Sequence, residues 1–235
     1  MGLPVHYQEL EMTYANTIGR GVQVLAVTSS DSREGVSTLA EALALRSEAG
    51  GKKTLLVDLN MYHPSVDKRF VVLSKSDANL SNSDKLSVMN AEGTNICIVT
   101  APTADSNQLR LRERDVLKMN IDSWRKAYDS IIIDTSPLNA INRSNIPAET
   151  VCSLSDGGIL VVLAGKTTEI SVQGAYTRLA NAGARLLGTV INDRFNPSLS
   201  SELVRETYRL EKHLPGLMAK VRGMIRCSKF LNPVN

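Results

Sequence analysis

The sequence contains few of the residues that stabilise secreted or metal-binding proteins. Its 235 residues include only three cysteines, Cys97, Cys152 and Cys227, which are far apart and form no CxxC pair. The three histidines form no group with the spacing of metal ligands. An odd number of scattered cysteines predicts reduced thiols instead of a disulfide framework. We therefore expect a cytoplasmic protein.

Long hydrophobic runs and aromatic residues are also scarce. No stretch of 18 apolar residues and no signal peptide is evident, so a membrane role is expected to need a partner or a surface helix. Aromatic residues make up 4% of the chain and hydrophobic residues 43%, which predicts an aliphatic core in one globular domain, with or without a tail. The net charge of +3 is too small to indicate nucleic-acid binding, and we expect none.

What the chain does contain is a regular alternation of apolar and helical segments. Strands that are apolar throughout predict a mostly parallel sheet with helices on both faces. We predict a doubly wound α/β fold, in which ligands bind beyond the carboxyl ends of the strands. The segment 74–94 is rich in Ser, Asn and Asp, and is expected to be a surface loop or a short helix. The predicted strands are 24–27, 54–58, 96–100, 130–134, 158–163 and 186–192, and the main predicted helices are 9–18, 37–49, 109–127, 146–154 and 169–182.

The most informative stretch is 24–44, which has the order strand, polar loop, helix. In nucleotide-binding proteins such a loop is a P-loop, whose backbone N–H groups and helix N-terminus bind phosphate. The loop here contains Glu34 and Gly35. Ser37 and Thr38 start the helix, and Val36 stands where the usual Gly-Lys-Ser/Thr ending has its lysine. The alternative is that the two hydroxyl residues are ordinary members of a helix N-terminus.

Four further residues lie in this loop or at predicted strand ends. Asp58 and Asp134 each end an apolar strand. Two such carboxylates can hold Mg²⁺ together with Ser37, although aspartates also commonly cap loops. Asn192 could bind the edge of an adenine, but a turn residue is the favoured interpretation. Arg33 could replace the missing positive charge, but a solvated loop arginine is favoured.

Two charged segments are interpreted as ordinary surface. The run 110–114, RLRER, is predicted to be a solvated helix face. The segment 201–230 is a basic amphipathic helix or helix pair with a break at Pro215 and Gly216. Such a helix can lie on a membrane or in a groove, but packing on the sheet is favoured. We predict three parts: an amino-terminal helical segment (1–21), a P-loop NTPase-like domain (22–196) and a carboxy-terminal amphipathic helical tail (197–235).

Six sequence blocks occur in an order that is more specific than any one of them. They are VTSSDSREGVSTLAEALA at 27–44, TLLVDLNMYHPSVDKRF at 54–70, NICIVTAPTADSN at 95–107, YDSIIIDTSPL at 128–138, DGGILVVLAGKTT at 156–168 and LLGTVIN at 186–192. In this order they resemble the cytoplasmic kinase domain of the bacterial tyrosine kinases of capsule and exopolysaccharide assembly. These kinases belong to the Min/Par branch of P-loop ATPases, and the resemblance implies the same fold and a site for ATP or ADP with Mg²⁺.

The chain departs from this family at the loop and at the metal site. The family loop resembles T-S-x-x-P-G-E-G-K-S-T, whereas here Ser32 replaces the proline, Arg33 a glycine and Val36 the lysine. After the second strand the family has Asp-x-Asp, and the second acid is Asn60 here. The family's arginine before the turn proline is His63.

The two ends of the chain depart as well. The family's amino-terminal helix carries a glutamate with arginines three and six residues later, used in ring assembly. Here Glu11 is followed at those places by Tyr14 and Thr17. The family's tail has a cluster of tyrosines that are phosphorylated in trans, whereas this tail has Tyr208 alone. Together these losses predict a catalytically impaired protein.

The resemblance implies an accessory or regulatory role in exopolysaccharide or capsule biosynthesis and export. The expected partner is an inner-membrane polysaccharide co-polymerase or chain-length regulator, an active paralogue, or a second copy, which would place the protein at the inner membrane. Nucleotide binding at 34–38 and Asn192 is expected to be weak or absent. One alternative is an active ATPase or tyrosine kinase that uses Asp58 and Asp134, with a cation from Arg33, Lys52 or a neighbouring subunit. Another is a Min/Par-like membrane-associated positioning ATPase.

Overall fold

A computed structural model describes residues 7–61, 72–75, 86, 88–91, 93–100, 109–140 and 145–194, together with 203, 207 and 215–227. The chain divides into two compact units, Met1–Asn192 and Asp193–Asn235, which are described separately. Residues 62–70, which include His63, lie outside the described residues, and so does Tyr208.

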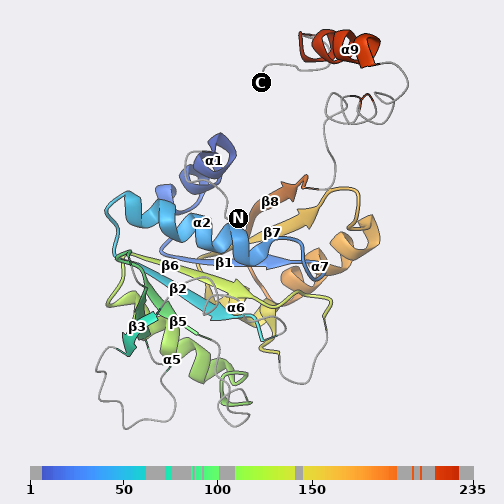
Figure 1. Ribbon diagram of the computed structural model, residues 1–235. Coiled ribbons are helices and arrows are strands. Elements are labelled where there is room, and N and C mark those ends of the chain that lie inside the picture. The colour runs from blue at the N-terminus through green and yellow to red at the C-terminus, as the bar shows by residue number, and fades with distance from the viewer. Residues whose placement is uncertain are drawn as a thin grey trace. The chain divides into compact units, whose positions relative to one another are not determined.

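An eight-stranded sheet forms the centre of the first unit (Figure 1). Its strands are β1 Val24–Ser29, β2 Thr54–Leu59, β3 Val72–Lys75, β4 Val88–Ala91, β5 Cys97–Val99, β6 Ser130–Thr135, β7 Gly157–Leu163 and β8 Leu186–Asn192. The strand order is β3-β4-β5-β2-β6-β1-β7-β8. In this spatial order, every pair of neighbouring strands from β5 through β2, β6, β1 and β7 to β8 is parallel. The pairs β3–β4 and β4–β5 are antiparallel. The predicted mostly parallel α/β sheet is confirmed.

Helices cover both faces of the sheet. The helices of this unit are α1 Gln8–Asn16, the 3₁₀ helix η1 Ile18–Arg20, α2 Val36–Ala49, α5 Arg114–Arg125, α6 Ala148–Leu154 and α7 Glu169–Asn181. Residues of α1 and α2 share one buried cluster, and residues of α5, α6 and α7 share the other. Figure 1 shows α1 and α2 on one side of the strands and α5 on the opposite side.

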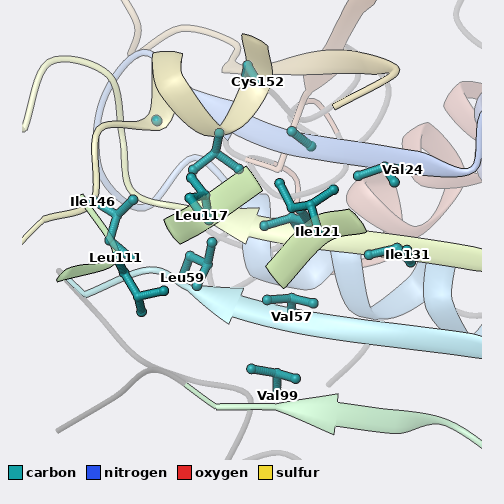
Figure 2. Packing of buried hydrophobic residues seen from close by; sticks show 14 of the residues in the cluster. Val24, Val57, Leu59, Val99, Leu111, Leu117, Ile121, Ile131, Ile146 and Cys152 are labelled. Carbon is teal, nitrogen blue, oxygen red and sulfur yellow. The ribbon is translucent and has the colours of Figure 1, made fainter. Parts of the chain in front are cut away.

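The two clusters follow from the alternation of side chains along each strand. In β6, Ile131 and Ile133 belong to the cluster with α5, and Ile132 belongs to the cluster with α2. Figure 2 shows part of the first cluster, where Ile121 of α5 lies over the sheet near Ile131. Because successive residues of a strand point to opposite faces of the sheet, a strand that is apolar at every position is buried on both faces.

Local signals set the helix ends. The N–H of Gly50 donates to the carbonyl oxygens of Arg46 and Ser47 at 3.2 and 3.1 Å, and Gly51 follows with φ of +80°. This arrangement satisfies carbonyls that a helix end leaves without partners, so the predicted stop of α2 is confirmed. At the start of α7, the Thr168 hydroxyl accepts a hydrogen bond from the Ser171 N–H at 3.2 Å.

Two expectations about secondary structure are wrong. The segment 74–94 was expected to hold a loop or a short helix, but its ends pair as strands. β4 lies antiparallel to β5, and β3 adds to β4. Pairing to an existing sheet edge stabilises short strands that have little strand propensity of their own. The helix expected over 109–127 is interrupted, because residues 109 and 110 are helical, a turn follows at 111–113, and α5 ends at Arg125. Leu111 is buried and Arg112 is partly buried in that turn, so the interpretation of 110–114 as a solvated face is wrong for these two residues.

In the second unit, helix α9 (Pro215–Cys227) begins at the proline where a break was predicted. Proline is tolerated there because the first residue of a helix needs no N–H partner. Within the described residues, no helix is both long and apolar enough to span a bilayer.

Candidate phosphate-loop site

The loop between β1 and α2 has the backbone of a phosphate loop but an unusual side-chain lining. Gly35 has φ of +103° and precedes the first turn of α2. A Cβ at this position would lie 2.6 Å from Nδ2 of Asn192. That Nδ2 donates to the carbonyl oxygen of Glu34 at 2.9 Å. The end of β8 therefore contacts the loop, and only glycine fits between them.

Val36 packs into the core. Its side chain is 6% exposed and belongs to the cluster that includes Leu25 and Ala40. Ser37 and Thr38, the next two residues, are partly exposed. The residue in the lysine position thus contributes apolar packing, and it offers a bound phosphate no positive charge.

The structure places the two suggested replacement cations differently. Arg33 is exposed in the loop and has φ of +65°, a conformation that side chains other than glycine rarely adopt. Lys52 lies just before β2, and its Nζ donates to the carbonyl oxygen of Ile18 at 3.2 Å. Asp58 lies near the other end of β2, so Lys52 is at the opposite edge of the sheet from the loop. The suggestion that Lys52 supplies the cation is wrong.

Asp58 and Asp134 lie side by side. They are partners in the register of β2 and β6, and their residues are 1% and 0% exposed. Oδ1 of Asp58 accepts a hydrogen bond from the Asn60 N–H at 2.9 Å. Two buried carboxylates in adjacent strands repel each other, and a cation between them relieves the repulsion. Two carboxylates are fewer ligands than a bare cation needs, so the pair suits a Mg²⁺ ion that keeps several of its waters. No group of three acidic, His or Cys side chains suited to a metal occurs among the described residues.

A set of side-chain hydrogen bonds, which we call the loop brace, ties the loop to α7. It consists of contacts that join Asp31 and Glu34 to Asn139, Thr167 and Ser171. The Thr167 hydroxyl donates to Oε1 of Glu34, whose Oε2 accepts the Asp31 N–H at 3.1 Å. The Ser171 hydroxyl donates to Oδ2 of Asp31, and Nδ2 of Asn139 donates to the Ser171 hydroxyl at 2.8 Å.

The carboxyl group of Glu34 is buried within the loop brace. Glu34 is 2% exposed, and this burial raises its pKa above the ordinary value, while hydrogen bonds from Thr167 and from the Asp31 N–H act in the opposite direction. Sequence reasoning missed Asp31, Asn139, Thr167 and Ser171. The available signal was the hydroxyl-rich segment that follows β7, at the carboxyl edge of the sheet where the loop lies.

The glutamate of the amino-terminal helix has a partner within the chain. Nη2 of Arg46 donates to Oε1 of Glu11 at 2.7 Å, and the Arg46 guanidinium lies 4.3 Å from the ring centroid of Tyr14. The hydrogen bond from Arg46 lowers the pKa of Glu11. Arg46 of α2 thus pairs with Glu11, whose own helix α1 lacks the two arginines that the related kinases have after this glutamate.

Together, the sheet order, the β1–α2 loop and the acidic strand ends define the chain as a P-loop NTPase fold. Among solved structures, the septum site-determining protein MinD from Pyrococcus horikoshii with Mg-ADP matches with a TM-score of 0.58 at 20% identity, over 74% of this chain and 71% of that chain. The kinase domain of VpsO matches with a TM-score of 0.64 at 25% identity, over 78% of this chain and 92% of that chain.

More specifically, the homologues of this chain are bacterial tyrosine-protein kinases. YwqD of Bacillus subtilis is 28% identical over 188 residues, which cover 76% of this chain and 75% of YwqD. CpsD of Streptococcus agalactiae is 27% identical over 192 residues, which cover 78% of this chain and 80% of CpsD. The succinoglycan biosynthesis transport protein ExoP of Rhizobium meliloti is 23% identical over 181 residues, 22% of its length. No protein-family model matches the chain.

Proposed function

We propose that this protein is a catalytically impaired relative of the bacterial tyrosine kinases, with an accessory or regulatory role in exopolysaccharide or capsule biosynthesis and export. It acts by protein–protein contact. The observation that carries the proposal is Val36, which is buried at the position where a working loop has its lysine. Similarity to tyrosine-protein kinases and to a polysaccharide transport protein supports the process.

The missing lysine explains why catalysis is impaired. A lysine in this position makes charge-assisted hydrogen bonds to the phosphates, each worth about 1.5–3 kcal/mol. It also stabilises charge that develops during phosphoryl transfer, which depends on positioning and electrostatics. Arg33 adds bulk where the backbone must approach the phosphates closely. Asn60 removes one of the two acids that follow the second strand.

Any nucleotide that still binds uses the preserved parts of the loop. Glu34, Gly35, Ser37 and Thr38 surround the phosphates, and Asn192 holds the loop from β8. Asp58 and Asp134 hold Mg²⁺ through water, with Ser37. When bound, the metal neutralises phosphate charge. We expect weak binding of ATP or ADP, because the side chains of this site are mainly acidic.

Single-turnover ATP hydrolysis tests the proposal. The purified wild-type chain is compared with Val36→Lys and with Asp134→Asn, which removes a carboxylate that activity would need. We expect no hydrolysis by the wild type above that of Asp134→Asn. Turnover by the wild type that Asp134→Asn abolishes would show an active enzyme and contradict the proposal. ATP binding is also measured by calorimetry. Binding by Val36→Lys but not by the wild type would indicate that the site was lost recently.

Arg33 gives the active-enzyme alternative its best support. It is exposed in the loop, and among the described residues it has no hydrogen-bond or ion-pair partner. If it replaces the lysine, wild-type turnover falls in Arg33→Gln and is restored in part by Arg33→Lys. Under the main proposal, neither substitution changes the absence of turnover.

The partner is proposed to be an inner-membrane polysaccharide co-polymerase or an active kinase paralogue, so the protein works at the inner membrane through that partner. ExoP supports this, because a region similar to this chain forms part of a much longer protein named for transport. Co-purification of a tagged chain with the co-polymerase encoded in the same cell tests it. Failure to recover the co-polymerase with the tagged chain would contradict this partner.

A further inference from the structure

β8 lies at one end of the eight-stranded sheet and, among the described strands, pairs only with β7 (Figure 1). Its sequence, LLGTVIN, includes no charged residue and no proline. Natural sheets often protect an open edge with such residues, because the unpaired N–H and C=O groups there can pair with another chain. The register with β7 shifts between Gly158 and Ile159, so the regular part of this edge begins at Gly188. That part of β8 is open to a further strand.

The backbone groups of Thr189 and Ile191 point away from β7. The N–H of Ala164, directly after β7, donates to the carbonyl oxygen of Asn192 at 2.8 Å, so the backbone groups of Asn192 face β7. Along a strand the N–H and C=O groups of successive residues point to alternate sides, and the β7–β8 register is regular from Gly188 to Asn192. Thr189 and Ile191 thus face the outer side of β8, where no strand or turn of the described residues pairs with them.

The side chains of these two residues are exposed as well, and Ile191 is 70% exposed although it is apolar and lies within a strand. Their register partners in β7, Leu160 and Val162, belong to or pack against the cluster of α5. Both side chains therefore lie on that face of the sheet, whereas Val190 lies on the face of α2. A single exposed isoleucine is ordinary on a protein surface. Here it lies beside open backbone groups, and this combination favours a strand as the partner.

We propose that β8 pairs antiparallel with β8 of a second copy of this chain, about a twofold axis at Val190. In this register Ile191 of one copy lies opposite Thr189 of the other, and each such pair exchanges both of its N–H···O bonds. The two opposite side chains lie on the same face and cover each other. A twofold contact uses the same surface in both copies, so a strand without charged residues meets no like charge. The pairing does not rest on the proposed function, because it needs neither a nucleotide nor a polysaccharide co-polymerase.

Sedimentation velocity of the full chain tests the contact. We expect a dimer whose fraction increases with protein concentration over about a hundredfold range, as mass action requires. Ile191→Lys places a charge at the open edge and leaves the β7–β8 hydrogen bonds in place, so it should raise the dissociation constant of the dimer at least about tenfold. Met119→Lys is the matched control, because Met119 is an exposed apolar residue of α5. It should change the dissociation constant less than about twofold.

Engineered cysteines test the register, in a chain whose cysteines other than the buried Cys152 are changed to serine. Val190→Cys should form a disulfide-linked dimer on oxidation, because the two copies of this position face each other with Cα atoms about 4.5 Å apart. Thr189→Cys alone should cross-link poorly, since its two copies are diagonal neighbours and lie too far apart for a disulfide. A mixture of Thr189→Cys and Ile191→Cys should cross-link more than either variant alone, because these positions lie opposite each other.

A full chain that remains monomeric at every concentration would overturn the proposal and leave the edge of β8 to another partner. A dimer that Ile191→Lys leaves intact, or that Met119→Lys weakens as much, would overturn it as well, because the contact would then lie elsewhere. Cross-linking of Thr189→Cys alone that equals that of Val190→Cys would exclude this register. If Ile191→Lys does not fold, sedimentation of the wild type and the cysteine variants still decide.

Discussion

Gly35 is subject to two separate constraints. Its φ of +103° disfavours any side chain, and a Cβ would lie 2.6 Å from Nδ2 of Asn192. Gly183 provides a comparison, because it has φ of +69° and no atom within 4 Å of a built Cβ. The first constraint is shared by the two glycines, and the second applies to Gly35 alone.

Gly35→Ala should therefore destabilise the chain more than Gly183→Ala. A left-handed conformation costs alanine about 1–2 kcal/mol, and the contact with Asn192 adds to that cost in Gly35→Ala. Urea unfolding of both variants measures the difference. Adding Asn192→Ala should recover part of the loss in Gly35→Ala, because it removes the contact. Equal destabilisation by the two glycine substitutions would show that Asn192 does not constrain the loop.

Thr167 is the residue of the loop brace that best reports its strength. Its hydroxyl donates to Glu34, which is buried, so removing the hydroxyl leaves a buried carboxylate with one partner fewer. Thr167→Val should cost about 1–3 kcal/mol, whereas Thr167→Ser keeps the donor and should cost less. Thr177→Val is the control, because Thr177 is exposed on α7 and bonds only its own helix. A cost in Thr167→Val no larger than in Thr177→Val would contradict the brace.

At the scale of elements, an ion pair joins α5 to the amino ends of β1 and β7. Nη2 of Arg125 donates to Oδ1 of Asp156 at 2.7 Å, and Oδ2 of Asp156 accepts the N–H groups of Val24 and Gln23. Burial by itself would raise the pKa of Asp156, but the hydrogen bonds from Arg125 and from the backbone outweigh it, so the pKa lies below its ordinary value.

This ion pair predicts a loss of stability in acid. Because the pKa of Asp156 is lower in the folded chain, its contribution is complete above the unfolded value of about 3.9. The contribution is lost as pH falls from there through the folded pKa. The difference in free energy of unfolding between wild type and Asp156→Asn should therefore be constant from pH 7 to 5 and shrink towards pH 3. Asp122→Asn, which breaks an exposed pair with Lys118, should show a smaller difference. A difference for Asp156→Asn that does not vary with pH would contradict this account.

The elements differ in how far the sequence reveals them. Local patterns were enough for β6, where three isoleucines precede Asp134, and for α2, which ends at Gly50 and Gly51. They failed for β3 and β4, because pairing to β5 and not local composition makes those segments strands. They failed also for the loop brace and for Arg112, since each depends on residues far apart in the chain or on the burial of a single residue in a turn. Val36 and Asn192 were identified from sequence, but their packing was not.

At the scale of the whole molecule, the described residues of the phosphate loop and the strand ends at the carboxyl edge of the sheet include more acidic than basic side chains. Asp31 and Glu34 in the loop, with Asp58 and Asp134 at the strand ends, stand against Arg33 in the loop and Lys166 after β7. A triphosphate without a metal is disfavoured at such an edge. A ligand that brings a cation is favoured. This surplus of acidic side chains is separate from the substitution at Val36, and it is a second reason for proposing weak nucleotide binding.

The first unit contains the whole core of the sheet, which predicts that it folds without the rest of the chain. Every buried residue of the two clusters lies before β8 ends at Asn192. A chain that stops after Arg194 should unfold in one cooperative transition, as small domains do. Trp124, the single tryptophan, is buried in the cluster of α5 and reports on this core by fluorescence. The urea midpoint of the shortened chain should match that of the full chain followed by the same signal. A broad transition, or a native-state spectrum of exposed tryptophan in the shortened chain, would show that the sheet needs residues beyond Arg194 to fold.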